Sequence, residues 1–224
     1  AKQAGLNIGV LSSLIQAGAL SSKGDNRSLM VLEAQAFNLL TEREKRNFIT
    51  LGEKYEYKLL NAIADAKKGD LVGDDGKPLM KESRFNTFKK KYNPYKTIYD
   101  KNKKYENFAN WYFETQLLGY SHSTRLNKVF PEQTEALNDS IYYNSMFEND
   151  SARFIGVVED AFKRTSRNGN KYIKITVADE VGRYDAMLLN SRRGQNYDKY
   201  IDAGNQVPKK NNIVILYGTK GEDI

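Results

Sequence analysis

Strict alternation of apolar and polar positions marks the last third of the chain, from residue 151 onward. Between Lys171 and Val177, a β-branched residue at every second position alternates with Tyr172, Lys174 and Thr176. This pattern predicts a strand with one buried face. Three further apolar runs predict strands, and a polar stretch before the last of them predicts a helix. The strands are expected at 153–158, 183–189 and 213–217, and the helix at 191–203.

Three strands, a helix and a further strand follow the order of an OB-fold, a small barrel whose second and third strands and first loop bind oligonucleotides or oligosaccharides. The third predicted strand does not show which of its faces is buried, because the row of Tyr184 and the row of Met187 are both largely apolar. A strand that closes the barrel is expected beyond Ile224.

The first part of the chain shows helical periodicity instead. Residues 6–20 predict a helix that ends in a tight turn at Ala17-Gly18-Ala19. Asn26 is a good N-cap for a second helix that reaches residue 40. Thr41 and Glu44 form a capping-box pattern that opens a third helix, which is expected to continue toward Ala66.

Two aromatic stripes follow at helical spacing. The first carries Phe85, Phe88 and Tyr92 and is expected to end at Asn93-Pro94, and the second runs from Phe108 to Gly119. Residues 131–150 lack a clear period and are interpreted as a linker. The chain is therefore expected to be α+β, with a helix-hairpin-helix-like module at 1–50, a basic helical region at 51–130, the linker at 131–150 and an OB-fold at 151–224.

The positive charge of the chain is concentrated in one segment. The net charge is +7, yet Lys77 to Lys104 carries ten lysines and arginines against only Glu82 and Asp100. Such a region is typical of proteins whose partner bears phosphates. Lys89, Lys90 and Lys91 are therefore candidate electrostatic contacts. The aromatic residues between the lysines either stack on bases or belong to a helical core, and their regular spacing favours the core.

Several kinds of chemistry lack their sequence patterns. The chain has no cysteine and a single histidine, His122, which excludes a Cys/His zinc site and disulfide bonds and fits a reducing cytoplasm. It contains no nucleophile elbow, no Walker-type phosphate loop and no dinucleotide fingerprint. No apolar run is long enough for a membrane span. We therefore predict no catalytic residue, metal or cofactor in this chain.

The strongest binding signal is the basic turn between the first two predicted strands. Its cations surround Asn168-Gly169, and an aromatic residue between lysines follows on the second strand, which is the combination that single-stranded nucleic acids need. The alternative is a solvated hairpin whose charges discourage edge-to-edge association. The candidate DNA-binding residues of this region are Lys163, Arg164, Arg167, Asn168, Lys171, Tyr172 and Lys174.

Six motifs, taken in order, resemble the C-terminal region of bacterial or phage DNA polymerase III alpha subunits. They are Leu6–Leu20, Asn26-Arg27, Phe113–Tyr120, Ala152–Val158, Arg167–Gly169 and Val177–Gly182, short segments distributed between residues 6 and 182. The chain departs from the family at Ser121-His122-Ser123, where the family has serine-glycine-histidine-proline. Residues 51–104 have no counterpart in the family pattern, and neither does the first half of the tandem hairpin.

The resemblance implies a role in DNA replication. Ala17, Gly18 and Ala19 would bind the duplex backbone through their amides, and the OB-fold would hold the single-stranded template. The catalytic carboxylates and their two magnesium ions would belong to an upstream palm domain, so the chain is expected to be part of a DNA-directed polymerase. The sliding clamp and the clamp loader are further expected partners, although Gln35–Leu39 and Ser145–Phe147 match a clamp-binding peptide poorly.

Two alternatives from other classes remain open at the level of sequence. The first is a protein-interaction scaffold that contacts the clamp or its loader without binding DNA. The second is a tRNA-binding OB module, which the hairpin-like N-terminal region argues against.

Overall fold

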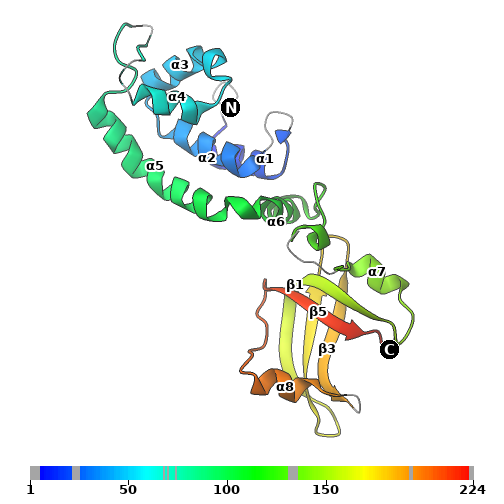
Figure 1. Ribbon diagram of the computed structural model, residues 1–224. Helices are drawn as coiled ribbons and strands as arrows, with labels where there is room; N and C mark the ends of the chain where they lie inside the picture. The colour runs from blue at the N-terminus through cyan, green and yellow to red at the C-terminus, as the bar shows by residue number, and fades with distance from the viewer. Residues whose placement is uncertain are drawn as a thin grey trace. The chain divides into compact units, whose positions relative to one another are not determined.

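The computed structural model describes residues 6–21, 26–67, 69, 71–73, 75–130, 136–191 and 194–221. The chain folds into two compact units, Ala1–Leu117 and Leu118–Ile224, and each has its own core. The first unit is helical, and the second is built around an antiparallel sheet (Figure 1). The expected α+β class is confirmed at this level.

Three helices of the first unit begin where a side chain accepts a hydrogen bond from the first backbone amides. Asn7, Asn26 and Thr41 each accept a hydrogen bond from the first turn that follows, and Glu44 completes the predicted capping box. The N-caps predicted at Asn26 and Thr41 are thus confirmed. The helices are α1 (Ile8–Gln16), α2 (Arg27–Asn38), α3 (Glu42–Thr50), α4 (Leu59–Ala66), α5 (Glu82–Asn102) and α6 (Glu106–Leu118), with single turns η2 (Glu53–Tyr55) and η3 (Lys103–Tyr105).

The third helix ends at Thr50, so its expected continuation toward Ala66 is wrong. Beyond Gly52 the chain turns through Glu56 and Tyr57, two residues with left-handed backbone at φ 50° and 57°. The amide of Tyr57 donates to the carbonyl of Gly52 at 2.7 Å, and a Cβ on residue 52 would lie 2.7 Å from the Tyr57 ring. Glycine at this position therefore permits the turn that separates α3 from α4.

The interruption expected at Pro94 is also wrong, because α5 continues through this residue. Proline inside a helix removes a backbone hydrogen bond and costs about 3 kcal/mol. Phe88 and Tyr92 are buried on α5 and their rings stack at 5.4 Å, and burial of such a ring contributes about 1.5–3 kcal/mol. Burial of these two rings on the N-terminal side of the proline thus offsets its cost, and the prediction that these two aromatic residues belong to a core is confirmed.

The core of the first unit lies where α2, α3, α4 and the first half of α5 meet. Arg43 of α3 fixes the loop before α5, since its guanidinium bonds both carboxylate oxygens of Asp75 at 2.9 and 2.7 Å. The buried apolar residues of this core are Leu32, Ala36, Leu40, Phe48, Ala62, Ile63, Ala66, Leu79, Met80, Phe88 and Tyr92.

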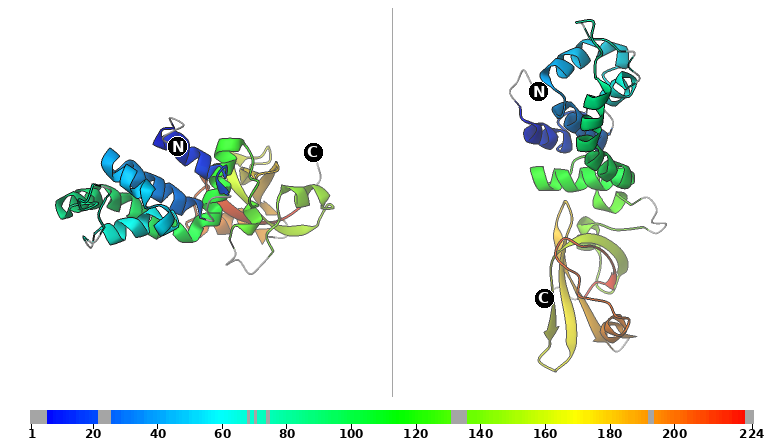
Figure 2. Two further views of the ribbon diagram at one scale, coloured as in Figure 1. Left: turned by 90° about the horizontal axis from the view of Figure 1, so that it is seen from above. Right: turned by 90° about the vertical axis from the view of Figure 1, so that its left-hand side faces the viewer.

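The second unit is a curled half-barrel of five antiparallel strands in the order β4-β3-β2-β1-β5 (Figure 2). The four strands and the helix predicted by the alternation are all present, and β4 is a short addition. The elements are η4 (Leu126–Lys128), α7 (Ser140–Ser145), β1 (Ser151–Thr165), β2 (Lys171–Ala178), β3 (Arg183–Ser191), β4 (Gly194–Gln195), α8 (Asn196–Asp202) and β5 (Ile213–Thr219).

The first strand is longer than the alternation predicts, because it continues past a bulge. A bulge between Val158 and Asp160 shifts its register, so that its first half pairs with β5 and its second half pairs with β2. The same side of the sheet, which we call the inner face, carries the core on both halves. Its buried side chains include Val158 on β1 and Ile173, Ile175 and Val177 on β2.

Both short helices of this unit pack toward the inner face. Tyr143 and Met146, in and after α7, reach the core at one end of the sheet, and Tyr197 of α8 reaches it at the other end. Residues 136–150, interpreted from the sequence as a linker, contain α7, and the backbone of Asn138 bonds to β1 at Arg153 and Ile155. This segment is therefore part of the second unit's structure.

Candidate nucleic-acid interface

The register of β1, β2 and β3 groups six side chains on the outer face, the side of the sheet opposite the core. Residues that pair directly across antiparallel strands lie on the same face, about 4.5–5.5 Å apart. One row of paired residues is Phe162, Lys174 and Met187. The next row, toward the β1–β2 turn, is Arg164, Tyr172 and Leu189. We call these six residues the outer-face cluster.

The outer-face cluster is open to solvent. Met187 is 55% exposed and Leu189 is 38% exposed, whereas their neighbours Ile173 and Ile175 on β2 are buried on the inner face. The side chains of α7 and α8 that join the core pack toward that inner face. Exposed apolar side chains that gather in one patch mark interaction surfaces more often than isolated ones do.

Cations lie among the rings of the cluster. The guanidinium of Arg164 lies 4.5 Å from the centroid of the Phe162 ring, a cation–π contact that holds both groups at the surface. The ammonium of Lys174 lies 2.5 Å from a carboxylate oxygen of Asp185 on the neighbouring strand. The cluster therefore offers flat apolar surface with positive charge beside it.

Asp185 partly neutralises this surface. Hydrogen bonds donated by Lys174 and by the Thr176 hydroxyl, the latter at 2.7 Å, hold the pKa of the Asp185 carboxyl below its usual range. The carboxylate is therefore charged at neutral pH and competes with any phosphate for Lys174.

The turn between β1 and β2 is tight and carries two candidate residues at its tip. Gly169 takes a positive φ of 79°, and its amide donates to the Ser166 carbonyl at 3.0 Å. The Ser166 amide in turn donates to the Asn170 carbonyl at 2.8 Å. Arg167 and Asn168 are exposed at this tip.

The seven residues predicted here gather at one end of the sheet but do not share one face. Arg164, Tyr172 and Lys174 lie on the outer face. Lys163 pairs with Ile173 and Lys171 pairs with Thr165, so both lysines lie on rows that continue the inner face beyond the core. Arg167 and Asn168 project from the turn. The structure thus assembles three of the seven into the outer-face cluster.

Sequence reasoning missed the other three members, Phe162, Met187 and Leu189. Phe162 lies beyond the first run of alternation, past the bulge that reverses the phase of β1. The signal for Met187 and Leu189 was the doubly apolar third strand, whose second row proves to be exposed. Only the cross-strand register shows that these three side chains lie beside the cations.

The amides of the predicted phosphate-binding hairpin already have acceptors. The Ala17 amide donates to Ser13, that of Gly18 to Ile15 and that of Ala19 to Leu14, at 2.8, 2.9 and 3.0 Å. With Gly18 at φ 84°, this is the Schellman arrangement that closes α1. A phosphate at these amides would have to displace helix bonds, so we leave Ala17, Gly18 and Ala19 out of the interface.

Lys89, Lys90 and Lys91 are exposed on α5 but diverge from one another. Successive residues of a helix point about 100° apart, so three consecutive lysines spread over about 200° of the surface. They contribute a diffuse positive field near the helix and do not line a single face.

A buried ion pair in the first unit was not apparent from the sequence. Arg27 at the start of α2 pairs with Glu114 of α6, a carboxylate with no exposed surface, and it also donates to the Gln16 carbonyl at the end of α1 at 3.3 Å. The pair ties three helices together. Arg27 and Glu114 belong to two of the motifs quoted for the family resemblance, which therefore meet in space.

Across the described ranges, every helix is too short or too polar to cross a membrane, and no three side chains of metal-binding types come together. His122 is exposed after the end of α6. Neither models of known protein families nor curated protein sequences gave a match to this chain. The interface described above rests on the chain's own residues.

Proposed function

We propose that the second unit binds single-stranded nucleic acid, without sequence specificity, on the outer face of β1, β2 and β3. The observation that carries this proposal is the pair of cross-strand rows that form the outer-face cluster. They bring four apolar or aromatic side chains together with Arg164 and Lys174 on the face opposite the core.

The chemistry of the cluster fits a strand of any sequence. Bases of any identity stack on aromatic side chains with about 1–3 kcal/mol per base. Phe162 and Tyr172 supply such rings, while Arg164 and Lys174 lie where they can neutralise phosphates. Lys163, Arg167 and Lys171 add positive charge at the end of the hairpin, with Lys163 and Lys171 on the opposite face of the sheet.

We also propose that the half-barrel is an OB-fold. Supporting this are the order of three antiparallel strands, a helix and a further strand, and a long, bulged β1 that pairs with both β2 and β5. In that fold the second and third strands carry the ligand, and they are the strands that hold Tyr172, Lys174, Met187 and Leu189.

The wider proposal is that this DNA-binding activity serves DNA replication, in the C-terminal part of a DNA polymerase III alpha subunit. It rests on the ordered motifs and is supported by the contact between Arg27 and Glu114. In this proposal primer-template DNA, the sliding clamp and the clamp loader are the partners. Nucleotidyl transfer and its two magnesium ions belong to a separate catalytic domain.

The test is the affinity for a fluorescently labelled oligothymidylate of about 12 nucleotides, measured by anisotropy at about 50 and 200 mM salt. We expect binding that weakens steeply with salt. The double variant Arg164→Glu/Lys174→Glu should lose on the order of tenfold at the lower salt. The matched control Lys209→Glu/Lys210→Glu changes the charge equally on an exposed loop before β5 and should lose far less.

Substitutions of Tyr172 test the contribution of stacking separately from that of charge. Tyr172→Phe should keep the affinity, whereas Tyr172→Leu should lose the stacking contribution of about 1–3 kcal/mol. Equal losses of affinity in both charge-reversal variants would show that binding depends only on net charge. That result would contradict a binding site on the outer face. No binding even at low salt, with capture of a clamp or loader subunit, would favour the scaffold function.

A further inference from the structure

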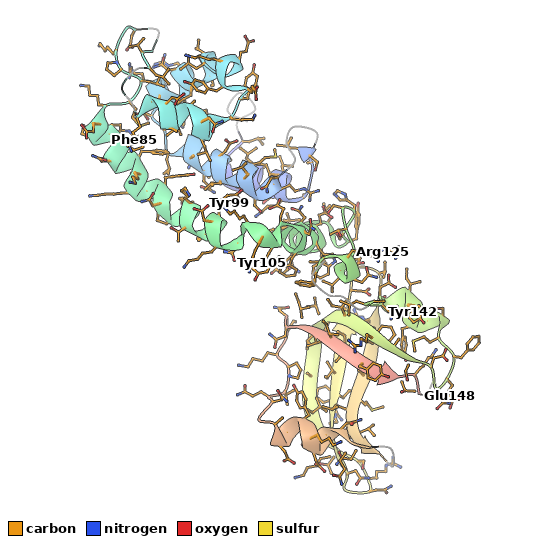
Figure 3. All side chains as sticks on the ribbon, in the orientation of Figure 1. Phe85, Tyr99, Tyr105, Arg125, Tyr142 and Glu148 are labelled. Atoms are coloured by element: carbon orange, nitrogen blue, oxygen red, sulfur yellow. The ribbon has the colours of Figure 1, made fainter. Side chains whose placement is uncertain are left out.

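The first unit contains an open groove of about 520 Å³ between α2, the second half of α5 and α6. A pocket of this size lies within the range of about 300–1,000 Å³ that takes small organic ligands. Its apolar walls include Val31 of α2, Ile98 of α5 and Phe108 of α6. Tyr99 and Tyr105, which Figure 3 labels, line it from α5 and η3.

The groove continues the apolar face of α5, which is buried in its first half and exposed further on. On α5, Tyr95, Ile98 and Tyr99 lie on the same helical face as the buried Phe88 and Tyr92, one to three turns further on. Tyr95 is 41% exposed and Ile98 is 63% exposed, whereas Phe88 and Tyr92 belong to the core that α5 forms with α2, α3 and α4. Tyr105 and Tyr112 add two further half-exposed rings at the rim.

Side chains with hydrogen-bonding amides and positive charge accompany these rings. Gln16, Gln35, Asn102 and Asn110 line the groove. Between residues 96 and 104 the chain carries four lysines against one aspartate, Asp100, which pairs with Lys96 and Lys103. The lining itself contains no carboxylate among the described residues.

We propose that this groove binds the bases of single-stranded nucleic acid, as a second site separate from the outer-face cluster. Half-exposed tyrosines provide stacking surfaces, side-chain amides match the edges of unpaired bases, and the adjacent lysines neutralise the phosphates. This inference rests on the proposed function for the nature of the partner, but it uses none of the residues of the second unit.

The combination favours a nucleic acid over an acidic peptide helix. An amphipathic helix buries aliphatic side chains in a groove and has little use for amides within it. Here the amides lie among flat rings, and Lys101 and Lys104 are exposed in the adjoining segment, where lysines outnumber the one aspartate, which suits a phosphodiester chain.

The test is photocrosslinking of the full chain to an oligothymidylate of about 12 nucleotides that contains 5-iodouracil, which reacts with nearby aromatic residues, followed by peptide mapping. We expect crosslinks at Tyr95, Tyr105 or Tyr112 for the groove and at Phe162 or Tyr172 for the outer-face cluster. Tyr57 is 73% exposed in the same unit as the groove and serves as an internal control that should not react.

Charge reversal then tests the groove alone. Lys101→Glu/Lys104→Glu should lower the groove crosslinks on the order of tenfold and leave those at Tyr172 in place. The matched variant Lys89→Glu/Lys90→Glu changes the charge equally on α5, the helix that carries Lys101, and should leave the groove crosslinks close to the wild-type yield.

The two proposals fail separately in this experiment. Crosslinks at Tyr172 without any in the groove would overturn the groove site and leave the proposed function standing. Crosslinks in the groove without any on the sheet would overturn the proposed function of the outer face and leave the groove site standing. Equal reaction at Tyr57 and at the groove tyrosines, or a groove that an acidic helical peptide occupies in place of the oligonucleotide, would also overturn the groove site.

Discussion

At the scale of single residues, Asp185 is the group that sets how strongly the outer-face cluster attracts phosphate. Asp185→Asn keeps the shape of the side chain but releases Lys174, so the affinity for oligothymidylate at low salt should rise on the order of threefold. The measurement is the same anisotropy titration. Asp160→Asn is the control, because it removes a charge from the same face at a carboxylate that bonds the Ala161 amide. Equal gains in both variants would show that net charge, and not Lys174, is responsible.

A second residue-scale prediction concerns Asp75. Its paired bonds with Arg43 lower the pKa of the Asp75 carboxyl to about 2, against about 3.9 in an unfolded chain. The folded form thus binds a proton less readily, so the stabilisation is complete above about pH 4 and disappears as the pH falls through about 2. Asp75→Asn should be less stable than the wild type at neutral pH, and the two should converge in acid. A difference in unfolding free energy that does not change with pH would contradict this.

At the scale of elements, the buried pair of Arg27 and Glu114 holds α1, α2 and α6 together. Arg27→Met removes the cation paired with a fully buried carboxylate and should cost about 3–5 kcal/mol of unfolding free energy. Arg27→Met/Glu114→Leu removes both charges and should recover much of that loss. The single tryptophan, Trp111, is buried on α6 one turn from Glu114, so urea unfolding followed by its fluorescence reports on this unit. A double variant as unstable as the single one would show that the pair is not the source of the effect.

The elements also show what the sequence determines locally. Short-range signals were sufficient for the N-caps at Asn26 and Thr41, for the alternating β2 and for the end of α1 at Gly18. They were insufficient where packing from distant segments decides the outcome. Pro94 remains inside α5 because Phe88 and Tyr92, which precede it, are buried in the core, and α3 ends where Tyr57 folds back over Gly52.

The proposed interface also could be predicted only in part from the sequence. The cations and Tyr172 could be chosen from the sequence because charge and alternation are local properties. Which of them share a face depends on the pairing of three strands and on a bulge at Val158, and neither is encoded in a short window. For that reason Lys163 and Lys171 were grouped with Tyr172, while Phe162 and Met187 were overlooked.

At the scale of the whole molecule, two separately packed units carry two surfaces of similar chemistry. The outer-face cluster and the groove both combine rings with cations, and the segment from Lys77 to Lys104 concentrates the positive charge of the chain in the helical unit. If both surfaces bind the same strand, the salt dependence of binding should be steeper for the full chain than for either charge-reversal variant, because each variant removes phosphate contacts.

The most direct test of the central claim observes the outer-face cluster itself. The chain has four methionines, so a spectrum of methyl-labelled methionine contains four signals. Met187 is 55% exposed within the cluster, while Met80 and Met146 are buried in the two cores. On addition of oligothymidylate, the stacked bases should shift the Met187 methyl signal strongly and leave those of Met80 and Met146 in place. A Met187 signal that does not move while the oligonucleotide is bound would contradict the account.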